Sequence, residues 1–123
     1  REHSVPLSQA AWDVLQQARG LWPDGTEPAG LIFPGTKNKP ISDMTLTQLL
    51  RRMQQPYTVH GFRASFRTWG ADIAHYEHDM LEIALSHIVG DATVRAYHRS
   101  DMIEKRRKLM SEWAVYLSLH NVS

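Results

Sequence analysis

Short runs of apolar residues at helical spacing, separated by prolines and glycines, constrain this chain more than any other feature. Ser8 is a favourable N-cap residue, and the apolar residues at positions 11, 14, 15 and 18 follow the spacing of one helix face until Gly20. Similar runs recur as far as residue 119, whereas strand-like alternation is confined to residues 2–7. The pattern predicts a mainly α-helical fold with at most a short N-terminal strand remnant, which Pro6 would confine to an edge.

N-cap residues mark where the later helices should begin. Ser42 and Thr58 can each cap a helix. Asp91 can cap a short helix that continues to Tyr97, and a final amphipathic helix is predicted over residues 101–119. The expected core faces are Leu46, Leu49, Leu50 and Met53; Phe62, Phe66, Trp69 and Ile73; Leu81, Ala84, Leu85 and Ile88; and Ile103, Met110, Trp113 and Leu117.

One long loop is predicted, over residues 22–40. This stretch holds four prolines, and residues 31–33 (Leu-Ile-Phe) are its expected buried anchor. Because no repeat or internal boundary is visible in 123 residues, we predict a single domain over residues 1–123.

Composition excludes several classes of protein. The chain has no cysteine, so it has no disulfide framework and no thiolate metal site, and a reducing cytoplasm is compatible with it. No apolar run is long enough to span a bilayer, and the first residues do not follow the plan of a signal peptide.

A net charge of +1 conceals two basic stretches. Residues 51–67 contain four arginines and no acidic residue, and residues 95–108 contain six basic residues against two acidic ones. Such stretches attract a phosphate backbone, although an ordinary solvated surface has the same composition. The residues predicted to bind DNA are Arg51, Arg52, Arg67, Arg95 and Arg99.

The helix predicted after Thr58 separates a cationic face from an apolar one. At about 100° per residue, His60, Arg63 and Arg67 fall within about 60° of one another, opposite Phe62 and the other apolar residues of the segment. The first turn of this helix also exposes N–H groups that favour an anion such as phosphate.

Other polar residues have ordinary structural explanations when taken singly. His87 is expected near a helix C-terminus, where a histidine often satisfies the last carbonyls, and Tyr97 can be a partly buried aromatic residue. Residues 75–78 contain two histidines and a carboxylate but no third ligand at a familiar spacing, so no metal site is predicted.

The order and spacing of four of these residues resemble a known family. The segment His60-Gly61-Phe62-Arg63 precedes Leu85-Ser86-His87, and Tyr97 follows ten residues after the second histidine. This order resembles the His-x-x-Arg motif, the Leu-x-His box and the nucleophilic tyrosine of the tyrosine recombinases, the phage-integrase family. The likeness to its prophage-integrase branch covers essentially the whole chain, including Thr58-Val59-His60, Val94-Arg95-Ala96-Tyr97, Lys105-Arg106-Arg107 and Trp113-Ala114-Val115-Tyr116-Leu117.

The resemblance implies site-specific DNA recombination that uses no metal, ATP or other cofactor. Tyr97 would attack a DNA phosphodiester and form a 3′-phosphotyrosyl link with a free 5′-hydroxyl. Arg63 would hold nonbridging phosphate oxygens bidentately, while His60 and His87 would donate hydrogen bonds to the phosphate. The predicted catalytic residues are His60, Arg63, His87 and Tyr97.

The resemblance also implies parts that these residues do not supply. The family uses a further arginine and a lysine, which the likeness places upstream of Arg1. We therefore expect the chain to be the C-terminal portion of an integrase catalytic domain, truncated on its N-terminal side and inactive or nearly so alone. The expected partners of the full-length protein are double-stranded DNA attachment sites and three further copies in a homotetramer on DNA, in the bacterial cytoplasm. The helix at 101–119 would pack on its own domain or on a neighbouring protomer.

Two other classes of protein fit the sequence. A non-catalytic helical DNA-binding module would explain the arginine-rich stretches equally well. A protein-interaction domain built around the helix at residues 101–119 would show no salt-sensitive DNA binding.

Overall fold

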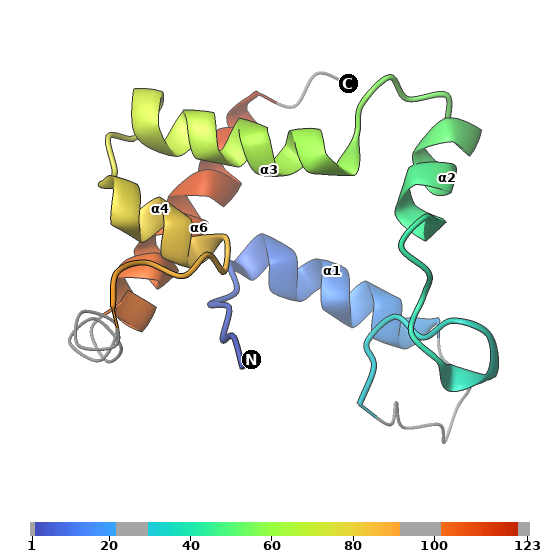
Figure 1. The fold of residues 1–123 in the computed structure, drawn as a ribbon. Helices are drawn as coiled ribbons and strands as arrows, with labels where there is room; N and C mark the ends of the chain where they lie inside the picture. Colours follow the sequence, from blue (N-terminus) through green and yellow to red (C-terminus); the bar gives the residue numbers. More distant parts are fainter. Residues whose placement is uncertain (1, 22–29, 92–101, 121–123) are drawn as a thin grey trace. The chain divides into compact units, whose positions relative to one another are not determined.

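The computed structural model describes residues 2–21, 30–91 and 102–120 and is mainly helical (Figure 1), which confirms the predicted fold class. The elements in chain order are α1 (Gln9–Gly20), a 3-10 turn η1 (Thr36–Asn38), α2 (Thr45–Arg52), α3 (Val59–Thr68), a π-helical turn η2 (Trp69–Ile73), α4 (His78–Ala84) and α6 (Met102–Leu119). Within the described ranges no strand forms, and the β-type pairing is an isolated bridge between Pro34 and Pro40. No described helix is both long and apolar enough to cross a membrane.

The chain divides into two compact units. The first unit combines Arg1–Trp12 with Ser65–Ser123, and the second unit is Asp13–Ala64. Helices α1 and α3 each contribute residues to both units.

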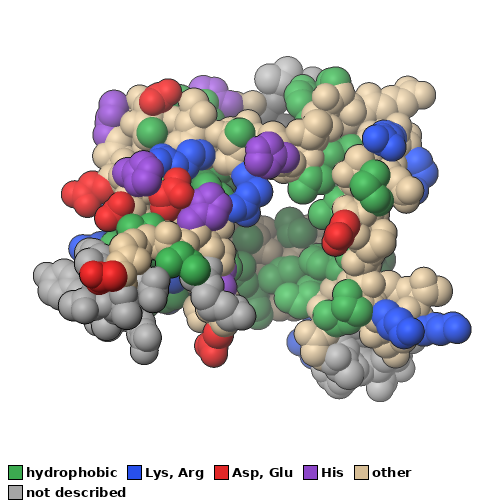
Figure 2. Space-filling model, viewed as in Figure 1, with side chains coloured by type: hydrophobic (Ala, Val, Ile, Leu, Met, Phe, Trp, Pro, Cys, Tyr) green, Lys and Arg blue, Asp and Glu red, His purple; other side chains and the backbone are tan. Residues whose placement is uncertain are grey.

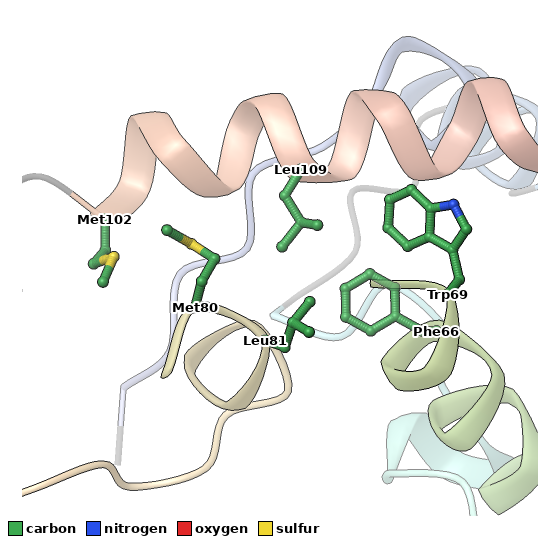
Figure 3. Packing of buried hydrophobic residues seen from close by; sticks show 6 residues of the cluster. All are labelled: Phe66, Trp69, Met80, Leu81, Met102 and Leu109. Atoms are coloured by element: carbon green, nitrogen blue, oxygen red, sulfur yellow. The ribbon is translucent and has the colours of Figure 1, made fainter. Parts of the chain in front are cut away.

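The core of the first unit lies where the end of α3 with η2, α4 and α6 meet. Figure 3 shows side chains of α6 pointing toward those of α3, η2 and α4. The buried residues of this core are Phe66, Trp69, Met80, Leu81, Met102 and Leu109. Trp113 closes one side, with its ring centroid 4.9 Å from that of Trp69 and 5.5 Å from that of Phe66. Aromatic pairs at such distances stabilise a core by more than the burial of their apolar area alone.

The structure tests three predicted helix caps. The Ser8 hydroxyl oxygen accepts a hydrogen bond from the Ala11 N–H at 3.1 Å, and the Thr58 hydroxyl accepts one from the Gly61 N–H at 2.9 Å, so these two caps are confirmed. The Ser42 prediction is wrong, because α2 begins at Thr45 and has no side-chain cap. The Ser42 hydroxyl instead lies 3.0 Å from the Thr45 hydroxyl.

The prediction of which α6 residues face the core is partly wrong. Trp113 and Met110 pack against the core as expected, but Leu117 is exposed and the fully or nearly buried positions are Met102, Arg106 and Leu109. One of these positions is a charged residue, Arg106, whose side chain is buried and whose guanidinium donates to the Ser4 carbonyl at 2.8 Å. A pattern of apolar residues alone does not anticipate a buried arginine.

The π-helical turn η2 explains one error in the predicted face after Thr58. Phe66 and Trp69 are buried as expected, but Ile73 is 55% exposed. In η2 the Ala74 N–H donates to the Trp69 carbonyl at 2.9 Å, a five-residue step. This wider turn changes the angle between successive side chains, so Ile73 leaves the face that a regular α-helix would give it.

Apolar residues predicted as core in the second unit are largely exposed. Phe62 is 52% exposed, and Ile32 and Phe33 are each 54% exposed. Leu46 and Leu49 on α2 and Met53 at its C-terminal end are exposed as well. No described residue of this unit is buried. A helix as short as α2 buries its face only against a second layer of structure, and the described part of this unit supplies none.

Replacing Gly70 by alanine should destabilise the first unit. A Cβ at this position would collide with the side chain of Leu81, which is fully buried. We expect a loss of about 1–3 kcal/mol in the free energy of unfolding, measured by denaturant titration. Gly20→Ala is the matched control, because no atom lies within 4 Å of the added carbon. Equal effects of the two substitutions would contradict this description of the core.

Candidate functional site

The N-terminal half of α3 carries two of the predicted catalytic residues. His60 and Arg63 are both exposed and lie three residues apart on this helix. Thr58 fixes the start of the helix through its hydrogen bond to the Gly61 N–H. A Cβ on Gly61 would lie 2.9 Å from the Thr58 hydroxyl oxygen, so the absence of a side chain at position 61 leaves space for the Thr58 cap. Thr58 and Gly61 therefore build the start of the helix that presents His60 and Arg63.

His87 lies three residues beyond Ala84, the last residue of α4. The Ser86 N–H donates to the Ile83 carbonyl at 2.9 Å, and the His87 N–H donates to the Glu82 carbonyl at 2.8 Å. These two bonds, with Ser86 at φ 66°, form a Schellman motif. The chain leaves the helix here, and Ile88 is 63% exposed, so its predicted place on the buried face is wrong.

The carboxylate of Glu82 contacts two basic side chains in the first unit. One oxygen lies 2.6 Å from His87 Nδ1, and the other accepts a hydrogen bond from Arg67 Nε at 2.9 Å. His78 Nε2 is farther away, 3.9 Å from the second oxygen. Glu82 therefore links Arg67, near the C-terminal end of α3, to His87, which lies beyond the C-terminal end of α4.

The pKa of Glu82 is lowered, first by the hydrogen bond with His87 and then by the hydrogen bond with Arg67. The carboxylate is thus ionised at neutral pH. Because its folded pKa lies below the ordinary value of 4.5, these contacts stabilise the fold above that pH, and their contribution is lost as the pH falls below it.

The structure brings together some of the residues singled out in the sequence. Arg67, predicted to bind DNA, lies with His87 on the same carboxylate, and neither the DNA contact nor the catalytic role is tested by this placement. Arg51 and Arg52 are exposed in the last turn of α2. Tyr97, Arg95 and Arg99 lie outside the described residues, as does the short helix predicted after Asp91.

Basic, acidic and histidine side chains lie intermixed on the face of the first unit that Figure 2 shows. Among residues 2–21, 30–91 and 102–120, no three His, Asp or Glu side chains are placed to hold a metal ion together.

Glu82 was not identified from the sequence, because an acidic residue in a short helix is common. Its position five residues before His87, across a helix end, was the available signal.

Sequence similarity extends over nearly the whole chain. The prophage integrase IntA of Escherichia coli K12 is 34% identical over 118 residues, which cover 93% of this chain and 27% of that protein. The integrase of Enterobacteria phage P4 is 32% identical over 126 residues, covering 97% of this chain and 28% of that protein. This chain is a homologue of phage and prophage integrases.

The shared region is a limited part of those integrases. A third relative, the prophage integrase IntZ of Escherichia coli K12, is 30% identical over 119 residues, which cover 93% of this chain and 28% of that protein. The chain therefore spans a little over a quarter of the length of these integrases. No protein-family model matches this integrase homologue, and no solved structure matches it.

Replacing Ser86 by glycine should stabilise this integrase homologue. Ser86 occupies the left-handed position of the Schellman motif, which costs a residue with a Cβ about 1–2 kcal/mol. Glycine removes this cost but loses more backbone entropy, so we expect a net gain of about 0.5–1 kcal/mol in a denaturant titration. Ser111→Gly, at an exposed position inside α6, should lower stability by about 0.5 kcal/mol. Changes of the same sign in both variants would contradict the assigned backbone strain.

Proposed function

We propose that this chain is the C-terminal portion of the catalytic domain of a tyrosine recombinase, and that the longer protein recombines DNA at specific sites. The observation that carries the proposal is the spacing of His60, Arg63, His87 and Tyr97 within a chain that is similar to integrases over 93–97% of its length. Exposure of His60, Arg63 and His87 supports it, because a DNA phosphate must reach these side chains.

Arg63 is the proposed anchor of the scissile phosphate. Its planar guanidinium can donate two parallel hydrogen bonds to nonbridging oxygens, and α3 holds it one turn after His60. His60 and His87 add donors to the same phosphate, and His60 is also a candidate for proton transfer with Tyr97. Donors held in place before the reaction stabilise charge that develops on the phosphate in the transition state.

The proposed reaction conserves the energy of the phosphodiester. The Tyr97 hydroxyl loses its proton as its oxygen forms a bond to phosphorus, the bond from phosphorus to the 5′-oxygen breaks, and that leaving oxygen gains a proton. The products are a 3′-phosphotyrosyl link and a free 5′-hydroxyl. A 5′-hydroxyl from a second strand reverses the step, so nothing is oxidised or reduced and no nucleotide is consumed.

The proposed partners are duplex DNA attachment sites and further copies of the same protein in a tetramer. In the first unit α6 packs on α3, η2 and α4 through one face, and Val115, Leu117 and Leu119 on this helix are exposed. We propose that a neighbouring protomer contacts α6 at these exposed residues when the protein assembles on DNA.

A suicide DNA substrate tests the proposed function. This substrate is nicked so that the 5′-hydroxyl fragment diffuses away, and the longer protein that carries these residues should then accumulate as a covalent protein–DNA band on a denaturing gel. The 123-residue chain alone should form no adduct, because we propose that the further arginine and lysine implied by the resemblance lie outside these residues. The absence of an adduct with the longer protein on its own attachment site would contradict the proposal.

The exposure of Arg51 and Arg52 also fits a non-catalytic DNA-binding module. In that case, replacing either arginine by alanine would weaken DNA binding and reduce its salt dependence by about one counterion per arginine. No variant of Tyr97 would then change any measured property of the DNA complex. Covalent attachment is therefore the readout that separates the two functions.

A further inference from the structure

Glu82 contacts the imidazole ring of His87, one of the proposed catalytic residues. The contact is at Nδ1, so the other ring nitrogen, Nε2, is the one proposed to face the DNA. The Glu82 carboxylate oxygen is 2.6 Å from His87 Nδ1, a short distance that is typical of a charge-assisted hydrogen bond. A carboxylate only accepts hydrogen bonds, so Nδ1 of His87 carries the proton in this pair. Nε2 is then the ring nitrogen through which His87 acts on a phosphate.

Arg67 fixes the carboxylate itself. Its Nε donates to the other oxygen of Glu82 at 2.9 Å, and both side chains are only about one-quarter exposed, at 26% and 22%. Each oxygen of the Glu82 carboxylate therefore has a separate basic partner. These two contacts fix the orientation of the carboxylate relative to the His87 imidazole. The Schellman motif adds a backbone constraint, because the His87 N–H is bonded to the Glu82 carbonyl at 2.8 Å.

We propose that Glu82 is a positioning residue for DNA cleavage, holding His87 with Nδ1–H directed at its carboxylate so that Nε2–H donates to the scissile phosphate. This inference rests on the proposed function. In the reacting state both ring nitrogens would carry protons, and the carboxylate supplies the negative charge that balances the imidazolium. A histidine without this partner would sample other ring orientations and the other tautomer.

The substitution Glu82→Gln tests the role of the carboxylate in the longer protein. The glutamine side chain has one accepting oxygen, so it cannot accept from His87 and Arg67 with two oxygens as the carboxylate does. We expect cleavage of the suicide substrate to slow by about 10- to 100-fold, as for other outer-shell partners of a histidine, with DNA affinity changed far less. The control is Glu104→Gln, which removes the charge of another arginine-bound glutamate on the exposed surface of α6 and should cut at the wild-type rate.

A double-mutant cycle distinguishes positioning from a general structural effect. If Glu82 acts through His87, Glu82→Gln should have little further effect on the cleavage rate of a His87→Ala protein. Full additivity of the two substitutions would overturn the inference, and so would a Glu82→Gln protein that cuts at the wild-type rate. If the wild-type longer protein forms no adduct, the proposed function fails first, and the inference fails with it.

Nitrogen NMR of the unmodified 123-residue chain provides a test that needs no variant to fold and no activity. The His87 ring should show a protonated Nδ1 at neutral pH, with slow exchange of its proton. A His87 ring protonated only at Nε2 would overturn the inference while leaving the proposed function intact.

Discussion

Replacing Tyr97 by phenylalanine should abolish covalent attachment of DNA to the proposed longer protein while leaving DNA affinity almost unchanged. The substitution removes a single oxygen, which is the atom that forms the bond to phosphorus in the proposed reaction. The aromatic ring remains, so noncovalent contacts are retained. The measurement compares the adduct on a suicide substrate with the affinity for the same DNA in a gel-shift titration.

Tyr57→Phe is the matched control for this substitution. Tyr57 is 63% exposed and lies just before the Thr58 cap of α3, so its phenylalanine variant removes the same oxygen from the same type of residue. The Tyr57 variant should form as much adduct as the unmodified protein. An adduct that persists in the Tyr97 variant would show that another residue is the nucleophile.

Replacing Arg63 by alanine should have the second largest effect. Loss of one preorganised donor to a developing negative charge raises a reaction barrier by about 3–4 kcal/mol, which corresponds to about 10²–10³-fold in rate. The measured quantity is the rate of adduct formation at saturating protein. The rate should fall more than the affinity for DNA, since the two hydrogen bonds strengthen in the transition state.

Replacing Arg63 by lysine separates the effect of its positive charge from the effect of its bidentate hydrogen-bond geometry. Arg63→Lys keeps the positive charge on α3 but cannot form the bidentate pair of hydrogen bonds, so we expect it to stay well below the wild-type rate. Arg107→Ala is the comparison on an exposed arginine that already pairs with Glu104, and it should retain most activity. A wild-type rate for Arg63→Lys would contradict the proposed phosphate contact.

Local signals in the sequence predicted the fold where the contacts are local. Ser8 and Thr58 cap their helices as expected, because a cap depends on residues within one turn. The burial of Phe66 and Trp69 was also predicted. The exposure of Ile73 was not, because the π-helical turn over Trp69–Ile73 departs from the regular helical spacing that the prediction assumed. In the same way, Arg106 is buried because the carbonyl of Ser4, about a hundred residues earlier, accepts its hydrogen bond.

The sequence predicted a set of candidate site residues but not how all of them are arranged in space. His60 and Arg63 both lie on α3, about one turn apart, as their spacing indicated. The contact of Glu82 with both Arg67 and His87 depends on how α3 and α4 pack in the first unit, and no pattern of spacing contains that information. Arg67 illustrates the difference, because its charge suggested a DNA contact and the structure shows it bound to a carboxylate.

Identification of the amino acid that carries the DNA tests the central claim most directly. The adduct formed by the longer protein would be trimmed with nuclease, digested with trypsin and sequenced by tandem mass spectrometry. We predict that the nucleotide remains on the peptide of residues 96–99, attached through the Tyr97 oxygen. A nucleotide on any other residue, or a complex that dissociates on denaturation and leaves no modified peptide, would contradict the assignment.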